Sequence, residues 1–463
     1  MHKIRRQKGR EITSKRLASM KKLNFNAAGV DIGSAAHYVA VPPDSDPDPV
    51  REFKSFTNDL YRLADWLEEC GVDTVAMEST GVYWIPLYDI LEERGFEVLL
   101  VNARQVKNVP GRKTDVLDCQ WIQQLHTYGL LRGCFRPDQE FVVLRSYMRQ
   151  REMLVECVST HIQHMQKALS QMNIQLHNVI TDITGITGMK ILRAIVSGNY
   201  QPHELAQYRD PRCKASADEI TEALTGHYRK EHLFCLKQAI EFYDITLLKI
   251  QECDAEIEKL LNFLESTSPV REEGLAPETR KRKVNRNEPK FEIRSPLHAL
   301  TGVDLTTITS IGPHRALRII SEIGTDMTRW PSKKHFGSWT TLSPHNKITG
   351  GRIMSSRTQP SNNRVADALR MAAMSVMRTQ TALGAFYRRK AAQIGKAKAI
   401  TATARKLAEI IYSMLKNGTS YQEPGADEYE QRYHKRLIKN MEKRAKTFGL
   451  QLVPLEPKTA EVS

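Results

Sequence analysis

Short apolar strands alternate with helical stretches near the start of the chain, and this alternation constrains the fold more than any other feature of the sequence. The first two strands flank Gly33-Ser34, a turn that joins them as a hairpin. The predicted elements are strands at 28–32, 37–41, 74–77 and 97–101 and helices at 60–69 and 86–94. Strands that alternate with helices form a sheet covered by helices, so we expect an α/β domain here.

Carboxylates stand at the ends of these predicted elements. Asp31 lies in the first strand just before a glycine turn, and Glu78 directly follows the strand at 74–77. If those two strands are neighbours, both carboxylates meet at one point on the sheet. Asp115 and Asp118 are three residues apart at the start of a predicted helix, so they share one helix face. A bound cation would remove the repulsion between them, although an ordinary solvated first turn also tolerates such a pair.

Converging carboxylates are the ligand set of metal-ion nucleases. Such enzymes use three or four of them to hold one or two Mg²⁺ ions, which activate an attacking oxygen and stabilise the leaving one. The ordered set of a strand Asp, a strand-end Glu and a helix Asp pair therefore predicts a Mg²⁺ site, with Mn²⁺ as the alternative ion. Its ligands are Asp31, Glu78, Asp115 and Asp118.

The chain of 463 residues carries a formal net charge of +15. Lys and Arg that neutralise phosphates release condensed counterions, so nucleic acid is the first candidate partner. An anionic membrane is the alternative, which we set aside because no apolar run approaches the roughly 18 to 20 residues of a spanning helix. The seven cysteines are scattered, odd in number and without a Cys-x-x-Cys pair, which fits small buried residues in a reducing cytoplasm.

Two long stretches of helical periodicity occupy the middle of the chain. Apolar residues recur at helical spacing over 138–178 and again over 232–264, without an internal Pro or Gly in either stretch. Two such helices favour an antiparallel coiled coil or a dimerisation arm, and an ordinary helical bundle within one subunit is the alternative.

Charged segments flank these regions. Residues 1–25 hold nine Lys and Arg against Glu11, which predicts a phosphate-binding arm or else a merely solubilising tail. Residues 266–296 mix Pro, Gly and alternating charge, as is typical of a linker. A compact helical domain follows to about residue 418, and a charged helix over 427–446 precedes a polar tail.

Two motifs of the C-terminal part carry candidate chemistry. Residues 310–316 are similar to a helix-hairpin-helix turn, where the backbone N–H groups around Gly312 could hold a DNA phosphate, or the turn is a simple helix connection. Residues 342–352 join a hydroxyl, two glycines and flanking bases in one loop. Gly350 and Gly351 would let backbone approach a phosphate, while Lys347 and Arg352 would bind its oxygens.

Three N-terminal motifs closely resemble those of the DEDD transposases of bacterial insertion sequences: GVDIG at 29–33, MESTG at 77–81 and KTDVLD at 113–118. The resemblance implies a RuvC-like domain with a ribonuclease H-type fold, in which the four carboxylates take the four acidic positions. It also implies that basic side chains near the last motif hold backbone phosphates. These are Arg104, Lys107 and Lys113.

The resemblance extends over 307–377, where the family carries a loop whose serine, just before a glycine, is implicated as the nucleophile. This chain has Thr349 at that position, followed by Gly350. Threonine keeps the hydroxyl, but its methyl group restricts χ1 and crowds an in-line attack. The alternatives are the hydroxyls of Ser343, Ser355 and Ser356, or a reaction without a covalent nucleophile. Arg357 supplies another phosphate-binding side chain.

The resemblance implies a DNA transposase of an insertion sequence, acting in the bacterial cytoplasm on donor and target DNA. It also implies guidance by a noncoding bridge RNA. If the metal and the hydroxyl lie in separate domains, a composite site is needed, and another subunit of a dimer or tetramer held by the long helices is its expected source. The rival readings are a hydrolytic nuclease such as a Holliday-junction resolvase, and a non-enzymatic DNA-binding protein. The expected division is a basic arm at 1–25, a RuvC-like domain at 26–135, long coiled-coil helices at 136–265, a linker at 266–296, a mainly helical transposase domain at 297–420, and a charged helix and tail at 421–463.

Overall fold

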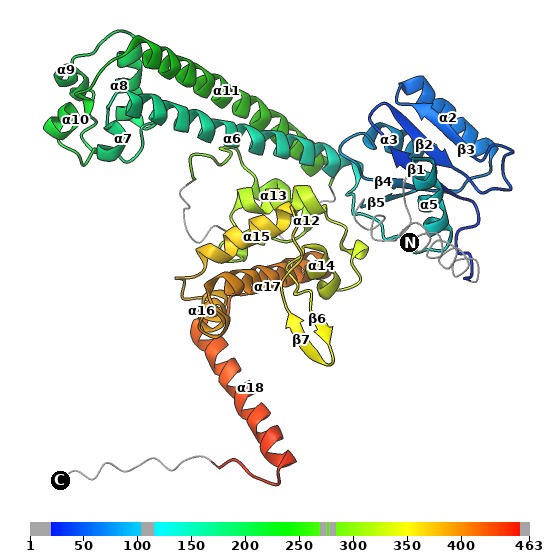
Figure 1. Ribbon diagram of the computed structural model, residues 1–463. Coiled ribbons are helices and arrows are strands. Elements are labelled where there is room, and N and C mark those ends of the chain that lie inside the picture. Colours follow the sequence, from blue (N-terminus) through cyan, green and yellow to red (C-terminus); the bar gives the residue numbers. More distant parts are fainter. Residues whose placement is uncertain (1–19, 103–114, 269–274, 276, 278–283, 454–463) are drawn as a thin grey trace, which may run out of the picture. The chain divides into compact units, whose positions relative to one another are not determined.

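The computed structural model describes residues 20–102, 115–268, 275, 277 and 284–453, with the backbone alone at 115–117. The chain divides into two compact units, residues 1–136 and 137–463. The first unit is built on a sheet, and the second is mainly helical (Figure 1). This confirms the expected α/β plus α fold class.

A five-stranded sheet of order β3-β2-β1-β4-β5 forms the centre of the first unit. Strands β1, β2 and β3 form an antiparallel meander, and β4 and β5 continue the sheet parallel to β1. The arrangement is consistent with the RuvC-like, ribonuclease H-type fold that the resemblance implied. The strands span Ala27–Ile32 (β1), Ala36–Ala40 (β2), Val50–Lys54 (β3), Thr74–Glu78 (β4) and Glu97–Val101 (β5).

The predicted hairpin and the strands at β4 and β5 are confirmed, whereas β3 was not predicted. Its sequence, Val-Arg-Glu-Phe-Lys, carries three charged residues, and only Phe53 packs against the core. Charged side chains are common on edge strands because they discourage pairing with other chains. The hydrophobic alternation that identifies a strand from sequence is therefore weak in β3.

Helices cover both faces of this sheet. Helices α2 (Thr57–Glu69) and α3 (Ile85–Glu93) bury their apolar stripes against one face, where Val30 and Met77 are fully buried. Helix α5 (Asp115–Thr127) packs on the other face, where Ile122 meets Ala76 of β4. The sheet is thus a rigid platform whose strand ends are fixed from both sides.

In the second unit, α6 (Gln139–Gln171) and α11 (Lys230–Thr267) run antiparallel to each other (Figure 1). The ring of His161 stacks on that of Phe242. The helix predicted to reach 178 ends earlier because Asn173 adopts a left-handed φ of 54°, a common way to end a helix. Four short helices connect the pair and share its core: α7 (Leu176–Val179), α8 (Ile186–Val196), α9 (Pro202–Ala206) and α10 (Ala217–Leu224).

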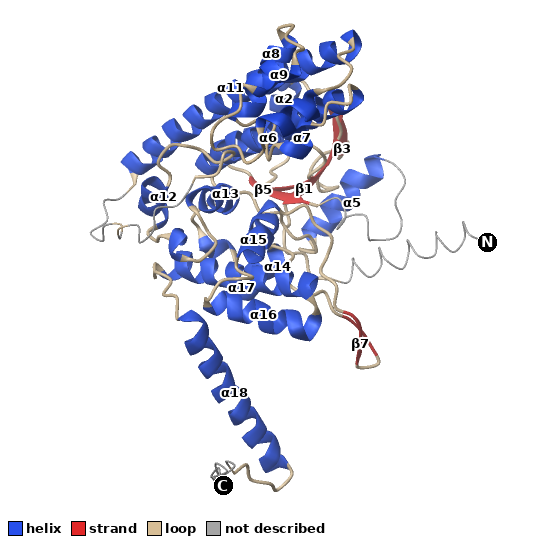
Figure 2. Ribbon diagram, turned by 90° about the vertical axis from the view of Figure 1, so that its left-hand side faces the viewer, coloured by secondary structure: helices blue, strands red, loops and turns tan. Residues whose placement is uncertain are grey.

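The C-terminal half of this unit is a helical bundle with one small hairpin (Figure 2). Aromatic rings of Trp330, Phe336 and Tyr412 pack together inside it. No helix of the described ranges is long and apolar enough to span a bilayer. The elements are α12 (Arg294–Thr301), η1 (Leu305–Thr307), α13 (Pro313–Ile323), η2 (Met327–Arg329), α14 (Lys333–Trp339), β6 (Lys347–Thr349), β7 (Arg352–Ser355), α15 (Arg364–Ser375), α16 (Ala382–Ile394), α17 (Lys396–Asn417) and α18 (Gly425–Thr447).

Candidate active site

Asp31 and Glu78 lie side by side at the carboxyl ends of neighbouring parallel strands. In the register of β1 and β4, Val30 is paired with Met77, which places Asp31 and Glu78 at the next step along each strand. Side chains alternate between the faces of a sheet, so both carboxylates point away from the core that buries Val30 and Met77. The two strands are neighbours, which is the condition that the sequence argument set for these two carboxylates to meet.

Gly29 sets the position of α5 over this face of the sheet. A Cβ atom at Gly29 would lie 2.2 Å from the backbone nitrogen of Gln123 and 2.5 Å from the carbonyl oxygen of Cys119. Helix and strand backbones can approach this closely only because residue 29 lacks a side chain. The Gln123 side-chain amide also donates a 3.1 Å hydrogen bond to the carbonyl of Ala27.

The direction of α5 follows from its contacts with the sheet. His126, in the last turn, is 2.9 Å (Nε2 to Oγ1) from Thr74 at the start of β4, whereas Cys119 is near Gly29 in the middle of β1. The helix therefore runs antiparallel to β1 and β4, and its first turn lies toward their carboxyl ends. Asp118 belongs to that first turn, on the same side of the sheet as Asp31 and Glu78.

The charges of two of these carboxylates affect the pKa of the Cys119 thiol. Burial raises its pKa to about 12, and the negative charges of Asp31 and Asp118 add to the increase. Asp31 from β1 and Asp118 from α5 therefore share one electrostatic environment. At this edge of the sheet, three separate elements contribute carboxylates.

Asp115 is the first residue of α5, and its side chain lies outside the described part of the structure. Among the side chains that are described, no group of three Asp, Glu, His or Cys is arranged to hold a metal ion. The donor chemistry nevertheless fits Mg²⁺, which prefers carboxylate oxygens. Arg104, Lys107 and Lys113 also lie outside the described residues.

Sequence reasoning missed two neighbours of the acidic edge. Tyr38 is the cross-strand partner of Asp31 in the hairpin of β1 and β2, so its ring stands on the same face of the sheet. Thr80 donates a hydrogen bond of 3.0 Å from Oγ1 to Oε1 of Glu78, which is 4% exposed. Tyr38 could have been found by extending the predicted hairpin from its turn. Thr80 belongs to the MESTG motif at 77–81, but its hydrogen bond to Glu78 was not predicted.

The predicted nucleophile Thr349 lies on an exposed β-hairpin rather than in an irregular loop. It ends β6, and Gly350 and Gly351 form the two-residue turn into β7 with φ of 56° and 76°. A two-residue turn with positive φ at both positions favours glycine and matches the twist of the strands. The glycines therefore have a structural role here in addition to any approach to phosphate.

The hairpin register places a basic residue opposite Thr349. Thr349 is paired with Arg352, and Lys347 is paired with Ser355. Residues in register across an antiparallel pair stand on one face, so the side chains of Arg352 and Thr349 project from the same face of the hairpin. Arg357 extends the pairing beyond the hairpin, because its carbonyl accepts a 3.0 Å hydrogen bond from the backbone of His345.

Gly312 caps the start of α13, as the predicted turn requires, and Pro313 follows at the first helical position. The guanidinium of Arg315 turns back and donates to the carbonyl of Ser310, which itself has a φ of 85°. His314 is half-buried, and desolvation lowers its pKa to about 4. The element before this turn is the single 3₁₀ turn η1, so the motif departs from a full helix-hairpin-helix at that end.

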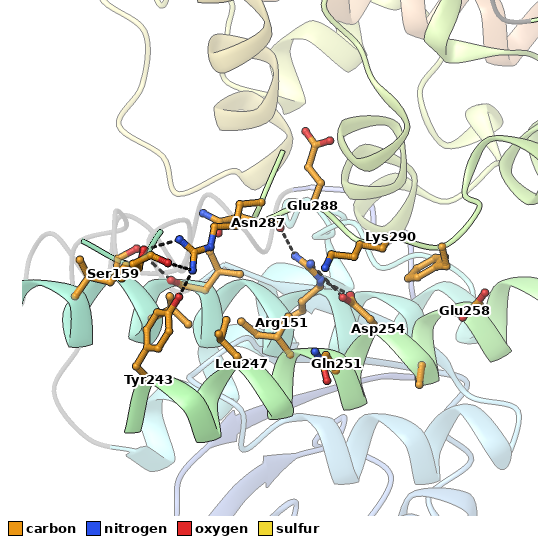
Figure 3. A pocket seen from close by; sticks show the side chains of 18 of the residues that line it. Arg151, Ser159, Tyr243, Leu247, Gln251, Asp254, Glu258, Asn287, Glu288 and Lys290 are labelled. Atoms are coloured by element: carbon orange, nitrogen blue, oxygen red, sulfur yellow. Dashed lines mark hydrogen bonds and ion pairs between the residues drawn. The ribbon is translucent and has the colours of Figure 1, made fainter. Parts of the chain in front are cut away.

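A hollow of about 850 Å³ between α6, α11 and residues 284–291 contains none of the predicted site residues (Figure 3). Its charges pair across the hollow: Arg151 donates to Asp254 over 2.5 Å, and Arg286 lies 3.0 Å from Asp182. The first pair joins the two long helices, and the second ties Arg286, which lies inside the predicted linker, to the loop before α8. Both pairs have a structural role.

Comparison with known protein families identifies the class of protein to which the chain belongs. Residues 28–174 match a family model of DEDD transposases of the IS110 type, described as a transposase. Residues 304–388 match the model described as "Transposase IS116/IS110/IS902 family". Together the two ranges cover half of the chain, and they contain the four carboxylates and Thr349. None of the curated proteins matches the chain.

These matches define the chain as a transposase, an enzyme that acts on DNA. The chain belongs to the DEDD transposases of insertion sequences, which confirms the family that its motifs resemble.

Proposed function

We propose that this transposase exchanges DNA strands by a metal-dependent transesterification. Asp31, Glu78, Asp115 and Asp118 would hold Mg²⁺, or Mn²⁺ in its place, and Thr349 would be the nucleophile. The observation that carries the proposal is the placement of Asp31 and Glu78 at adjacent register positions, with the first turn of α5 on the same side of the sheet.

When bound, the metal would polarise the scissile phosphate and stabilise the charge on its oxygens. The protein residues orient this chemistry. Glu78 is held by Thr80, Asp31 stands beside Tyr38, and the first turn of α5 is positioned by the backbone contact at Gly29. Groups fixed in this way need little reorganisation during the reaction, which lowers the barrier.

In the proposed step, Oγ1 of Thr349 attacks a backbone phosphorus atom. The new bond joins Oγ1 to phosphorus, and the bond from phosphorus to the leaving 3′ or 5′ oxygen breaks. The hydroxyl proton passes to a base, and the leaving oxygen takes up a proton. Arg352, paired with Thr349 across the hairpin, would bind the non-bridging phosphate oxygens. Attack by a strand-end hydroxyl on this phosphoester completes the exchange and restores Thr349.

The carboxylates and Thr349 belong to different units of the chain, so the reaction requires groups from both units to act on one phosphate. We propose that a dimer or tetramer, held by the long helices, supplies them from different subunits. We also propose that a noncoding bridge RNA pairs with donor and target DNA, and that the enzyme works in the bacterial cytoplasm. The family resemblance and the net charge of +15 support an additional polyanionic partner.

The test is strand exchange on element-end DNA with Mg²⁺ and the RNA encoded beside the element. The proposal predicts a protein–DNA adduct that survives denaturation and is absent in both Asp31→Ala and Thr349→Ala. Free cleaved ends without an adduct would instead favour a hydrolytic nuclease. Binding without cleavage would favour a DNA-binding protein that lacks catalytic activity.

A further inference from the structure

A second candidate site lies between α16, α17 and α18, after the end of both matched family ranges except for its first residue, Phe386. The three helices enclose a hollow of about 480 Å³. This volume is within the roughly 300 to 1,000 Å³ typical of pockets for small organic ligands. The hollow is therefore large enough for one nucleotide.

The lining of this hollow is strongly basic. Five Lys and Arg side chains contribute to it against one carboxylate, Glu409. Arg405 already uses that carboxylate, with Nε 3.2 Å from Oε1. The remaining positive charge has no acidic counterpart in the lining, so the hollow favours an anion. The five side chains are those of Arg389, Lys390, Arg405, Lys406 and Arg436.

Aromatic rings hold one of these cations in place. The guanidinium carbon of Arg389 lies 3.6 Å from the ring centroid of Tyr433 and 4.8 Å from that of Tyr429. Arg389 also donates a hydrogen bond to the Tyr429 hydroxyl. A stacked, hydrogen-bonded guanidinium loses little conformational freedom when its planar fork binds a phosphate.

Helix α18 continues the positive surface away from the hollow. From Gln431 to Thr447 it carries seven Lys and Arg against the single acid Glu442, and none of its residues is buried. Figures 1 and 2 show α18 leaving the bundle beside α16, with most of its length uncovered by the rest of this unit. A backbone that enters the hollow can therefore follow the helix and neutralise several charges in sequence.

We propose that this hollow binds a backbone phosphate of a single-stranded nucleic acid, with the adjoining nucleotide inside it and the strand running along α18. A positive groove that includes aromatic side chains is typical of single-strand binding. A duplex presents its phosphates on a stiff convex ridge that does not enter a concave site of this size. The inference shares one premise with the proposed function, which is that the enzyme binds nucleic acid. It does not depend on Thr349 or on the metal.

The test measures binding of labelled single-stranded RNA, single-stranded DNA and duplex DNA by fluorescence anisotropy. The full-length protein is used in EDTA, so failure of strand transfer cannot affect the result. The test variant is Arg436→Gln, and the matched control is Lys259→Gln, which removes one exposed cation from α11, away from the hollow lining and from α18. Lys406→Gln, on α17, is a second test variant.

We expect Arg436→Gln and Lys406→Gln each to weaken single-strand binding about tenfold, as loss of a charge-assisted phosphate contact does. Lys259→Gln should weaken it only about twofold, through the general loss of positive charge. The single-stranded ligand that binds with the higher affinity, RNA or DNA, identifies the natural strand. The proposal would be overturned if the test and control variants lost affinity for single strands equally, or if the test variants lost as much affinity for duplex DNA as for single strands. A change of oligomeric state in Arg436→Gln with unchanged binding would also overturn it.

Discussion

The two halves of the proposed reaction are carried by very different structures. The carboxylates stand on a five-stranded sheet that has helices on both faces, and Glu78 is almost fully buried. Thr349 stands on a two-stranded hairpin whose residues are nearly all exposed, including Ile348 and Ile353. An isolated hairpin is only marginally stable in water, whereas a covered sheet is rigid.

This contrast assigns different tasks to the two regions. A metal site needs carboxylates fixed to within fractions of an ångström, and the sheet supplies that through its register and packing. A nucleophile that is delivered to DNA needs access, which the exposed hairpin supplies. We therefore expect substitutions in the packing of the sheet to lower both stability and activity, and substitutions in the hairpin to lower activity while stability is kept.

The largest expected effect is that of Asp31→Asn. Loss of a ligand charge should slow DNA cleavage by about a thousandfold or more, because the metal contributes several kcal/mol to the transition state. Asp44→Asn, an exposed carboxylate in the loop after β2, is the matched control and should leave cleavage unchanged. Cleavage on a denaturing gel measures both, and an active Asp31→Asn enzyme would contradict the role of the sheet.

Substitutions of Thr349 separate its hydroxyl from its shape. Thr349→Val keeps the volume and lacks the hydroxyl, so adduct formation should fall by about a hundredfold or more. Thr349→Ser keeps the hydroxyl and removes the methyl group, so it should form adduct at least as fast as the natural protein. Equal activity of the Val and Ser variants would show that a different group attacks.

Gly29→Ala tests whether backbone packing positions α5. Its Cβ would overlap the backbone of Gln123 and Cys119, so the helix must shift. We expect a loss of about 1 to 3 kcal/mol in stability, as for other overpacked cores, together with a loss of cleavage. Gly337→Ala meets only ordinary contacts and serves as the control in thermal unfolding. An unchanged melting temperature and rate in Gly29→Ala would refute the close approach.

The smallest expected effect on stability is that of Gly350→Ala. A φ of 56° costs a residue with a side chain about 1 kcal/mol, and the open surroundings add no clash. The melting temperature should stay unchanged because the hairpin is not part of the core, while adduct formation decreases. If adduct formation is also unchanged, the hairpin turn does not position Thr349.

The sequence predicted the sheet region better than the hairpin. Apolar runs at 28–32 and 74–77 identified the strands, and Asp31 and Glu78 at their ends then followed from their neighbouring positions. The direction of α5 was not predictable, because it depends on contacts such as Gly29 with Gln123 that are distant in sequence.

The hairpin was mistaken for a loop although its signal was present. Two glycines in succession between short strand-like runs indicate a two-residue hairpin turn, but Lys347–Thr349 is too short to show alternation. The pairing of Thr349 with Arg352 therefore emerged only from the structure. The hollow beside α18 was also missed, because Arg389 and Arg436 come from helices whose packing the sequence does not specify.

The central claim is that the Thr349 hydroxyl attacks DNA held at the acidic edge. The most direct measurement is mass spectrometry of proteolysed adduct, formed with element-end DNA and Mg²⁺ and then digested with nuclease. The account predicts a nucleotide attached to the peptide that contains Thr349, in the natural protein but not in Asp31→Asn. A nucleotide on Ser343, Ser355 or Ser356, or cleaved DNA without any modified peptide, would contradict it.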